Sequence, residues 1–145
     1  MTQIIAVDDG LAMRQMLRAM LEPEGYTMLE AEDGAKGLVA LRATDHPSIV
    51  LLDYYMPHMD GGAVLRTVAD EGGLLARHEY IVISSSVGTF PEDFIDLLRQ
   101  LSIRILPKPF GRESLVSAVA QAAERLNAPL DEPFLFSADD ESAQS

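Results

Sequence analysis

Charged side chains stand directly after three of the short apolar runs in this chain. An acidic pair, Asp8 and Asp9, follows the first of these runs. Asp53 follows a run in the middle of the chain, and Lys108 follows one towards its end. If the runs are parallel strands of one sheet, their C-terminal ends share an edge, and open α/β sheets bind ligands at that edge. Three carboxylates and one ammonium group gathered there predict a site for magnesium and a phosphoryl group.

Carboxylates gathered at one edge of a sheet need a counter-charge. Two of them about 4 Å apart repel each other by roughly 4 kcal/mol at an effective dielectric constant near 20. Mg²⁺ is commonly held by one or two carboxylates together with phosphate oxygens, so it suits this cluster. Lys108 would supply a further positive charge, and the hydroxyl of Ser84, at the end of another apolar run, could donate a hydrogen bond at the same point. Ser85 is the alternative source of this hydroxyl.

Five apolar runs alternate with five segments of helical spacing. The strands that we expect are Ile4–Val7, Tyr26–Glu30, Ile49–Leu52, Tyr80–Ser84 and Ile103–Leu106. Apolar residues recur at helical spacing within residues 13–21, 33–42, 64–68, 94–101 and 115–126, and the third of these helices is expected to end near Gly72-Gly73. The alternation predicts an α/β fold, a doubly wound sheet of five parallel strands with right-handed crossovers and five helices.

The composition excludes several classes of function. The chain has 145 residues, 48 % hydrophobic and 23 % charged, so one domain with a real core is expected. It has no cysteine, which excludes disulfides, thiol catalysis and zinc–thiolate sites. Its formal net charge of −12 argues against binding nucleic acid by phosphate neutralisation. No apolar stretch approaches the roughly 20 residues of a membrane span, and the first residues do not look like a signal peptide, so we expect a cytoplasmic protein without membrane contact.

Part of the negative charge lies at the C-terminal end. Five of the 23 acidic residues and none of the 11 basic residues follow Asn127, so residues 1–126 carry a net charge of −7. We therefore expect a folded domain over residues 1–126 and an acidic, disordered tail over residues 127–145. The tail also contains an apolar cluster, Pro133–Phe136, and a docking segment is the alternative interpretation.

Taken in order, these motifs resemble those of the receiver domains of bacterial two-component response regulators, and in length the chain resembles the single-domain, CheY-like members. The resemblance covers about residues 3–126. It rests on Asp8-Asp9, Asp53, Met56–Gly61, Ser84 and Lys108-Pro109-Phe110. It implies a flavodoxin-like sheet with strand order 2-1-3-4-5, an order known for this family. It also implies a cis peptide between Lys108 and Pro109, an isomer that only an X–Pro bond adopts at low cost.

The resemblance further implies a phosphoacceptor. Asp53 would accept a phosphoryl group from a sensor histidine kinase or a phosphotransfer protein in a Mg²⁺-dependent reaction. The implied metal ligands are Asp8, Asp9, Asp53 and the backbone carbonyl of Tyr55, and the implied phosphoryl contacts are Ser84 and Lys108. Such a protein catalyses only its own phosphoryl transfer and dephosphorylation, and it would signal through contact with a downstream protein.

Position 105 departs from the family pattern. Members usually carry a Tyr or Phe there that rotates inward as the hydroxyl residue moves towards the phosphate, and Ile105 cannot reproduce that rotation. A pseudo-receiver that scaffolds partners without being phosphorylated is therefore an alternative. A Mg²⁺-dependent phosphatase with an aspartyl nucleophile is another, but such enzymes commonly place a second Asp two residues after the nucleophile, where this chain has Tyr55.

Overall fold

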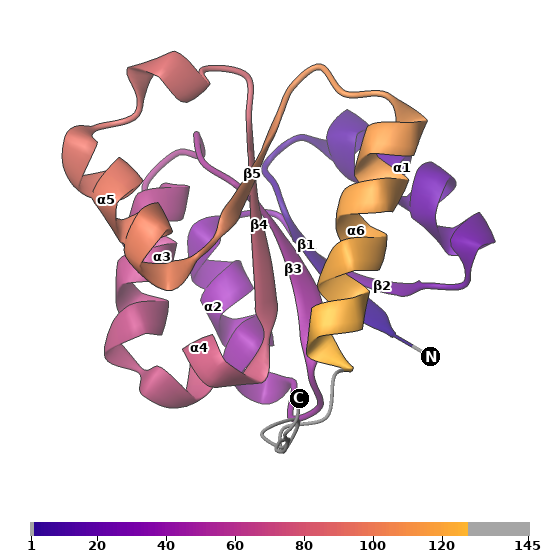
Figure 1. The fold of residues 1–145 in the computed structure, drawn as a ribbon, viewed down its shortest axis with the longest axis horizontal. Helices are drawn as coiled ribbons and strands as arrows, with labels where there is room; N and C mark the ends of the chain where they lie inside the picture. Colours follow the sequence, from indigo (N-terminus) through magenta and orange to yellow (C-terminus); the bar gives the residue numbers. More distant parts are fainter. Residues whose placement is uncertain (1, 128–145) are drawn as a thin grey trace, which may run out of the picture.

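The computed structural model describes residues 2–127, so nearly all of the predicted tail, including its apolar cluster, lies outside the described residues. Within them, five strands form one sheet in which all neighbouring strands are parallel (Figure 1). The strands are β1 (Gln3–Val7), β2 (Thr27–Ala31), β3 (Ser48–Asp53), β4 (Glu79–Ser84) and β5 (Arg104–Pro107). Their order is β2-β1-β3-β4-β5, which confirms the predicted fold class and strand order.

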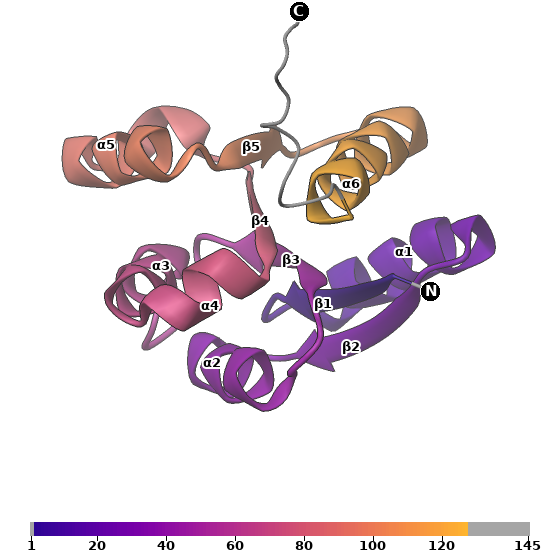
Figure 2. The ribbon, with the colours of Figure 1, turned by 60° about the horizontal axis from the view of Figure 1, so that its bottom comes forward.

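Helices cover both faces of the sheet. Their bounds are α1 (Leu11–Leu21), α2 (Gly34–Ala43), α3 (Gly61–Asp70), α4 (Gly72–Arg77), α5 (Glu92–Leu101) and α6 (Arg112–Leu126). One face packs against α1 and α6, and the other against α2, α3, α4 and α5, as Figures 1 and 2 show. Within residues 2–127 no helix combines the length and apolarity that crossing a bilayer requires.

The central strands are buried because their side chains serve two cores. Alternate residues of β1 point to opposite faces, so Ile5 joins the core under α2–α5 while Ile4 joins the core under α1 and α6. All six residues of β3 are buried, as expected of a strand covered on both faces. The sheet edge β2 is mostly exposed or half-buried, and it begins one residue later than predicted. The central strand β3 is thus more deeply buried than the edge strand β2.

The prediction of five helices is wrong, because the described residues form six α-helices. The additional helix, α4, begins at Gly72-Gly73, where we expected the preceding helix to end in a turn. The chain leaves helical geometry at Glu71 (φ −105°, ψ 78°) and then resumes it. Two glycines disfavour a helix by about 1 kcal/mol each. Burial of Leu74 and the bond from the Tyr80 hydroxyl to its carbonyl at 2.9 Å favour the extra turn, so tertiary packing outweighs propensity.

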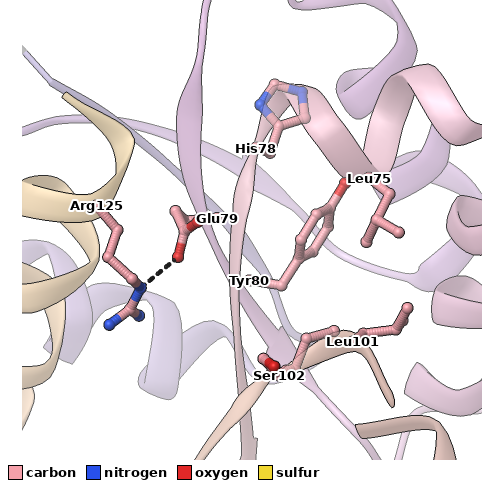
Figure 3. A pocket seen from close by; sticks show the side chains of 8 residues that line it. Leu75, His78, Glu79, Tyr80, Leu101, Ser102 and Arg125 are labelled. Atoms are coloured by element: carbon pink, nitrogen blue, oxygen red, sulfur yellow. Dashed lines mark hydrogen bonds and ion pairs between the residues drawn. The ribbon is translucent and has the colours of Figure 1, made fainter. Parts of the chain in front are cut away.

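His78, between α4 and β4, is a buried residue. Its ring lies near that of Tyr80 at the start of β4, and both residues line a hollow of about 190 Å³ (Figure 3). Glu79 and Arg125, which pair at 2.8 Å, also line this hollow. The Ser48 N–H donates to Nδ1 at 3.1 Å, so the neutral ring carries its hydrogen on Nε2, which faces the Leu41 carbonyl at 3.3 Å. Burial lowers the pKa of His78 below its ordinary value of 6.5.

Replacing His78 with glutamine is expected to flatten the pH dependence of stability below pH 6.5. The folded-state pKa of His78 is depressed, so its neutral form stabilises the fold above the unfolded-state pKa, and this contribution is lost as pH falls below about 6.5. Glutamine retains an acceptor and a donor but does not titrate. Urea unfolding at pH 7.5 and 5.5 measures the effect, in an Asp53→Asn background that removes the titration of Asp53. Equal pH dependence of the free energy of unfolding in the Asp53→Asn protein with and without His78→Gln would contradict this role of His78.

Candidate functional site

The C-terminal ends of β1, β3 and β5 bring the predicted site residues together at one edge of the sheet. Val7 of β1 pairs in register with Leu52 of β3. The residues that follow them, Asp8 and Asp53, therefore lie at the same edge of the sheet. One carboxylate oxygen from each of Asp8, Asp9 and Asp53 lies within 4.8 Å of the others. Asp8 and Asp53 are buried, whereas Asp9 is exposed. Two of the three carboxylates are therefore enclosed by the fold, and the third is accessible to solvent.

Lys108 supplies the positive charge inside this cluster. Its Nζ lies 3.4 Å from Asp53 Oδ1 and 3.5 Å from Asp8 Oδ2. Its backbone N–H donates to the Ser84 carbonyl at 2.8 Å, which fixes the lysine to the end of β4. The peptide bond between Lys108 and Pro109 is cis, as the family resemblance implied.

Local hydrogen bonds orient the Asp8 carboxylate. The Gly10 N–H donates to its Oδ1 at 2.8 Å, which leaves Oδ2 towards Lys108. The Asp8 N–H donates to the Ala31 carbonyl at 3.1 Å, and Arg14 Nη1 donates to the Asp8 carbonyl at 2.6 Å. Both the main chain and the side chain of this aspartate are therefore held before any ligand binds.

The Asp53 carboxyl is the most strongly perturbed acid of the cluster. Burial is the main cause, and with the nearby charge of Asp8 it raises the pKa of Asp53 to about 6, while Lys108 opposes the shift. Because 6 lies below neutral pH, this group is largely ionised there and remains able to act as a nucleophile. A divalent cation bound beside this carboxylate would favour its ionised form, because a nearby opposite charge stabilises the charged state.

Gly61 lets α3 begin against the end of β3. Its N–H donates to the Tyr54 carbonyl at 2.7 Å, and a Cβ built on it would lie 2.7 Å from the Asp53 carbonyl oxygen. The preceding Asp60 caps the helix, because its Oδ1 accepts the Ala63 N–H at 2.9 Å. The segment Met56–Gly61 thus folds back close to the acidic cluster.

A Gly61→Ala substitution is expected to lower the free energy of unfolding by about 1–3 kcal/mol, because the new methyl group would collide with main-chain atoms. Urea unfolding measures the loss. Gly72→Ala is the matched control, since a Cβ built there has no contact within 4 Å beyond its chain neighbours and the adjacent backbone of its own helix. Equal stability of the Gly61 variant and the wild type would show that the approach of α3 to β3 is not as tight as described.

The remaining predicted positions lie in different surroundings. Ser84 is buried at the end of β4, whereas Ser85 is exposed. Ile105 pairs with Val82 and packs half-buried against the core under α2–α5. Tyr55 is 46 % exposed, and the assignment of its backbone carbonyl as a metal ligand stays a prediction.

An aromatic cluster that the sequence did not predict lies around the segment after Asp53. The Tyr54 ring centroid lies 4.6 Å from those of Tyr55, Phe90 and Phe94. The cluster joins the loop after β3 to the start of α5. The Tyr-Tyr pair after Asp53 and two phenylalanines at helical spacing were visible signals, but only the fold shows that they meet.

The donor set fits a hard divalent cation. The three clustered side chains offer carboxylate oxygens, and Mg²⁺ binds oxygen ligands while keeping several waters. Three carboxylates and one lysine leave an excess of negative charge, which such a cation would balance. The geometry therefore supports an oxygen-liganded metal.

Comparison with known proteins defines the class. The family model described as the response regulator receiver domain matches residues 4–120, so the chain belongs to this family. It is 33 % identical to protein PilH of Pseudomonas aeruginosa over 119 residues, covering 82 % of this chain and 95 % of PilH. It is 32 % identical to response regulator MprA of Mycobacterium ulcerans over 133 residues, covering 90 % of this chain and 53 % of MprA. The chain thus spans about half the length of the MprA relatives.

Solved structures share the fold. Chemotaxis protein CheY4 of Vibrio cholerae matches with a TM-score of 0.71 and 24 % identity, covering 84 % of this chain and 98 % of CheY4. A CheY-like receiver domain protein of Methanospirillum hungatei matches with a TM-score of 0.76 and 23 % identity, covering 88 % of this chain and 98 % of its own.

Proposed function

We propose that this receiver domain accepts a phosphoryl group on Asp53 in a Mg²⁺-dependent reaction and signals through protein contact. The observation that carries the proposal is the position of the Asp53 carboxylate, clustered with those of Asp8 and Asp9 and 3.4 Å from the Lys108 ammonium group. Accepting a phosphoryl group is the general role of the family. The Asp53 carboxylate could act as the nucleophile, with the Lys108 ammonium group close enough to balance negative charge. Positioning and charge stabilisation are what phosphoryl transfer requires.

In the proposed reaction, an Asp53 oxygen attacks the phosphorus of a phosphohistidine. The new P–O bond forms as the P–N bond breaks, and the departing imidazole nitrogen takes up a proton. Lys108 would contact a phosphoryl oxygen, and Ser84 would donate a hydrogen bond to another. Asp8, Asp9, Asp53 and the Tyr55 carbonyl would hold Mg²⁺, which neutralises charge on the phosphoryl oxygens when bound. Hydrolysis of the aspartyl phosphate later resets the protein.

A surface beside the site supports a protein donor. A hollow of about 350 Å³ is lined by Met13, Met16, Ser85, Lys108, Pro109 and Phe110. Its lining is mostly apolar, and methionines adapt to varied partners. A sensor histidine kinase or a phosphotransfer protein could pack there while presenting its histidine to Asp53. We therefore propose that the donor binds on the α1 side of the site. We also propose that the reaction takes place in the cytoplasm.

Intact-mass measurement after incubation with acetyl phosphate tests the proposal. We expect the mass of one phosphoryl group to appear with Mg²⁺ and to be absent with EDTA. No gain with either acetyl phosphate or phosphorylated kinase would favour the phosphorylation-independent scaffold, the alternative supported by the core packing of Ile105. Turnover of phosphoester substrates would instead indicate the aspartyl phosphatase.

A further inference from the structure

A chain of hydrogen bonds ties the loop after β4 to the loop after β3. The former contains the 3-10 turn η2 (Val87–Thr89). The Tyr55 hydroxyl contacts Thr89 Oγ1, and Thr89 Oγ1 donates to the Ser86 carbonyl at 2.8 Å. The Ser86 N–H donates to Ser84 Oγ at 3.1 Å. The chain therefore runs without a break from the residue two positions after the acceptor to the hydroxyl at the end of β4.

The direction of each bond follows from counting hydrogens. A threonine hydroxyl has one hydrogen, and Thr89 gives it to the Ser86 carbonyl. The contact between Tyr55 and Thr89 is therefore donated by the tyrosine. Both backbone groups of Ser86 are occupied, one by Thr89 and the other by Ser84. Ser84 Oγ acts as an acceptor here, so its own hydrogen is left to be donated elsewhere.

The main chain of Ser84 is fixed more firmly than the loop that follows it. Ser84 ends β4, is only 1 % exposed, and accepts the Lys108 N–H on its carbonyl. What remains free is rotation of its hydroxyl group, and the Ser86 N–H restricts that rotation. The orientation of the hydroxyl thus depends on where the loop 85–89 is held.

Tyr55 can hold this loop because its ring is anchored by other aromatic rings. It stands edge-on to Tyr54 at 4.6 Å and lies 6.4 Å from Phe90, both of which are buried. The ring itself is 46 % exposed, so burial does not explain its position. Packing against the aromatic cluster brings its hydroxyl to Thr89.

On the basis of the proposed function, we propose that Tyr55 and Thr89 are positioning residues for phosphoryl transfer. They hold the β4–α5 loop so that the Ser84 hydroxyl donates to a phosphoryl oxygen on Asp53. A donor placed before the reaction need not reorganise during it. The aromatic residue that links this loop to the site is then Tyr55, two positions after Asp53. Ile105 on β5 packs against the core instead.

The test compares initial rates of phosphorylation by acetyl phosphate and Mg²⁺. Tyr55→Phe and Thr89→Val each remove one hydroxyl of the chain and are expected to slow the reaction about two- to ten-fold, the effect of one hydrogen bond. Ser84→Ala removes the final donor and is expected to slow it at least as much. If Tyr55 acts through Ser84, adding Tyr55→Phe to Ser84→Ala changes nothing further. Tyr26→Phe, which removes a hydroxyl just before β2, is the matched control and keeps the wild-type rate.

The proposal would be overturned if the losses of phosphorylation rate from Tyr55→Phe and Ser84→Ala were additive in the double variant. Wild-type rates in Tyr55→Phe and Thr89→Val would also overturn it. Hydrogen exchange of the Ser86 amide provides a readout that needs no phosphoryl donor. This exchange is expected to accelerate in Tyr55→Phe and Thr89→Val and to stay unchanged in Tyr26→Phe. Unchanged exchange in all three variants would also refute the proposed chain of hydrogen bonds. A wild type that takes up no phosphoryl group would refute the proposed function instead, which separates the two failures.

Discussion

Replacing Asp53 with asparagine is expected to stabilise the fold at pH 8 by up to about 3 kcal/mol. The pKa of Asp53 is about 6 in the folded protein and near 3.8 when unperturbed, so the ionised carboxylate opposes folding above pH 6. Each pKa unit corresponds to about 1.4 kcal/mol. Asparagine keeps the shape and removes the charge. As pH falls through 6 towards 3.8 the native state becomes protonated first, wild-type stability recovers, and the advantage of the variant disappears.

Urea unfolding of both proteins between pH 4 and 8 without metal measures this difference. Asp45→Asn is the control, because the Asp45 side chain is fully exposed and its replacement should have little effect. Added Mg²⁺ should stabilise the wild type more than the Asp53 variant, since a ligand of the native state adds to its stability. An advantage of the variant that persisted unchanged at pH 4 would contradict the link to ionisation of Asp53.

Lys108→Met is expected to slow phosphorylation by acetyl phosphate by roughly 100-fold, the usual effect of removing one charged or hydrogen-bonding group that stabilises a transition state. The same variant should bind Mg²⁺ several-fold more tightly. Lys108 Nζ competes for the Asp53 and Asp8 carboxylates, which lie 3.4 and 3.5 Å away, so its removal makes the site more negative. Opposite shifts in rate and metal affinity distinguish loss of a catalytic charge from general damage to the site.

Phosphorylation rates and calorimetric Mg²⁺ titration measure the two effects. Lys36→Met serves as the control, since Lys36 pairs with Glu32 on the surface and should leave both quantities unchanged. A variant of Lys108 that lost metal affinity together with rate would indicate that the lysine is needed mainly to hold the aspartates in place.

The meeting of Asp8, Asp53 and Lys108 could be predicted because it follows from topology. Each ends an apolar run that is too continuous for a solvent-facing strand, and parallel strands align their C-terminal ends. The cis Lys108–Pro109 bond came from the family resemblance and is confirmed.

What could not be predicted depends on contacts distant in sequence. The extra helix α4 forms despite Gly72-Gly73 because Leu74 finds a core position, which local propensity does not reveal. The burial of His78 depends on Ser48, its hydrogen-bond partner 30 positions away. The link between Tyr55 and Thr89 spans 34 positions. In each case the contact joins residues that are distant in sequence, and neither residue's local sequence predicts it.

Chemical trapping of the phosphoryl group tests directly whether Asp53 is the residue that receives it. Borohydride reduces an aspartyl phosphate to homoserine, so reduction of the protein after treatment with acetyl phosphate and Mg²⁺, followed by peptide mass analysis, reads the modified position directly. We expect homoserine at position 53 and unmodified aspartate at positions 8 and 9. Homoserine at either of those positions, or at none in protein that has gained a phosphoryl group, would show that Asp53 is not the phosphorylated residue.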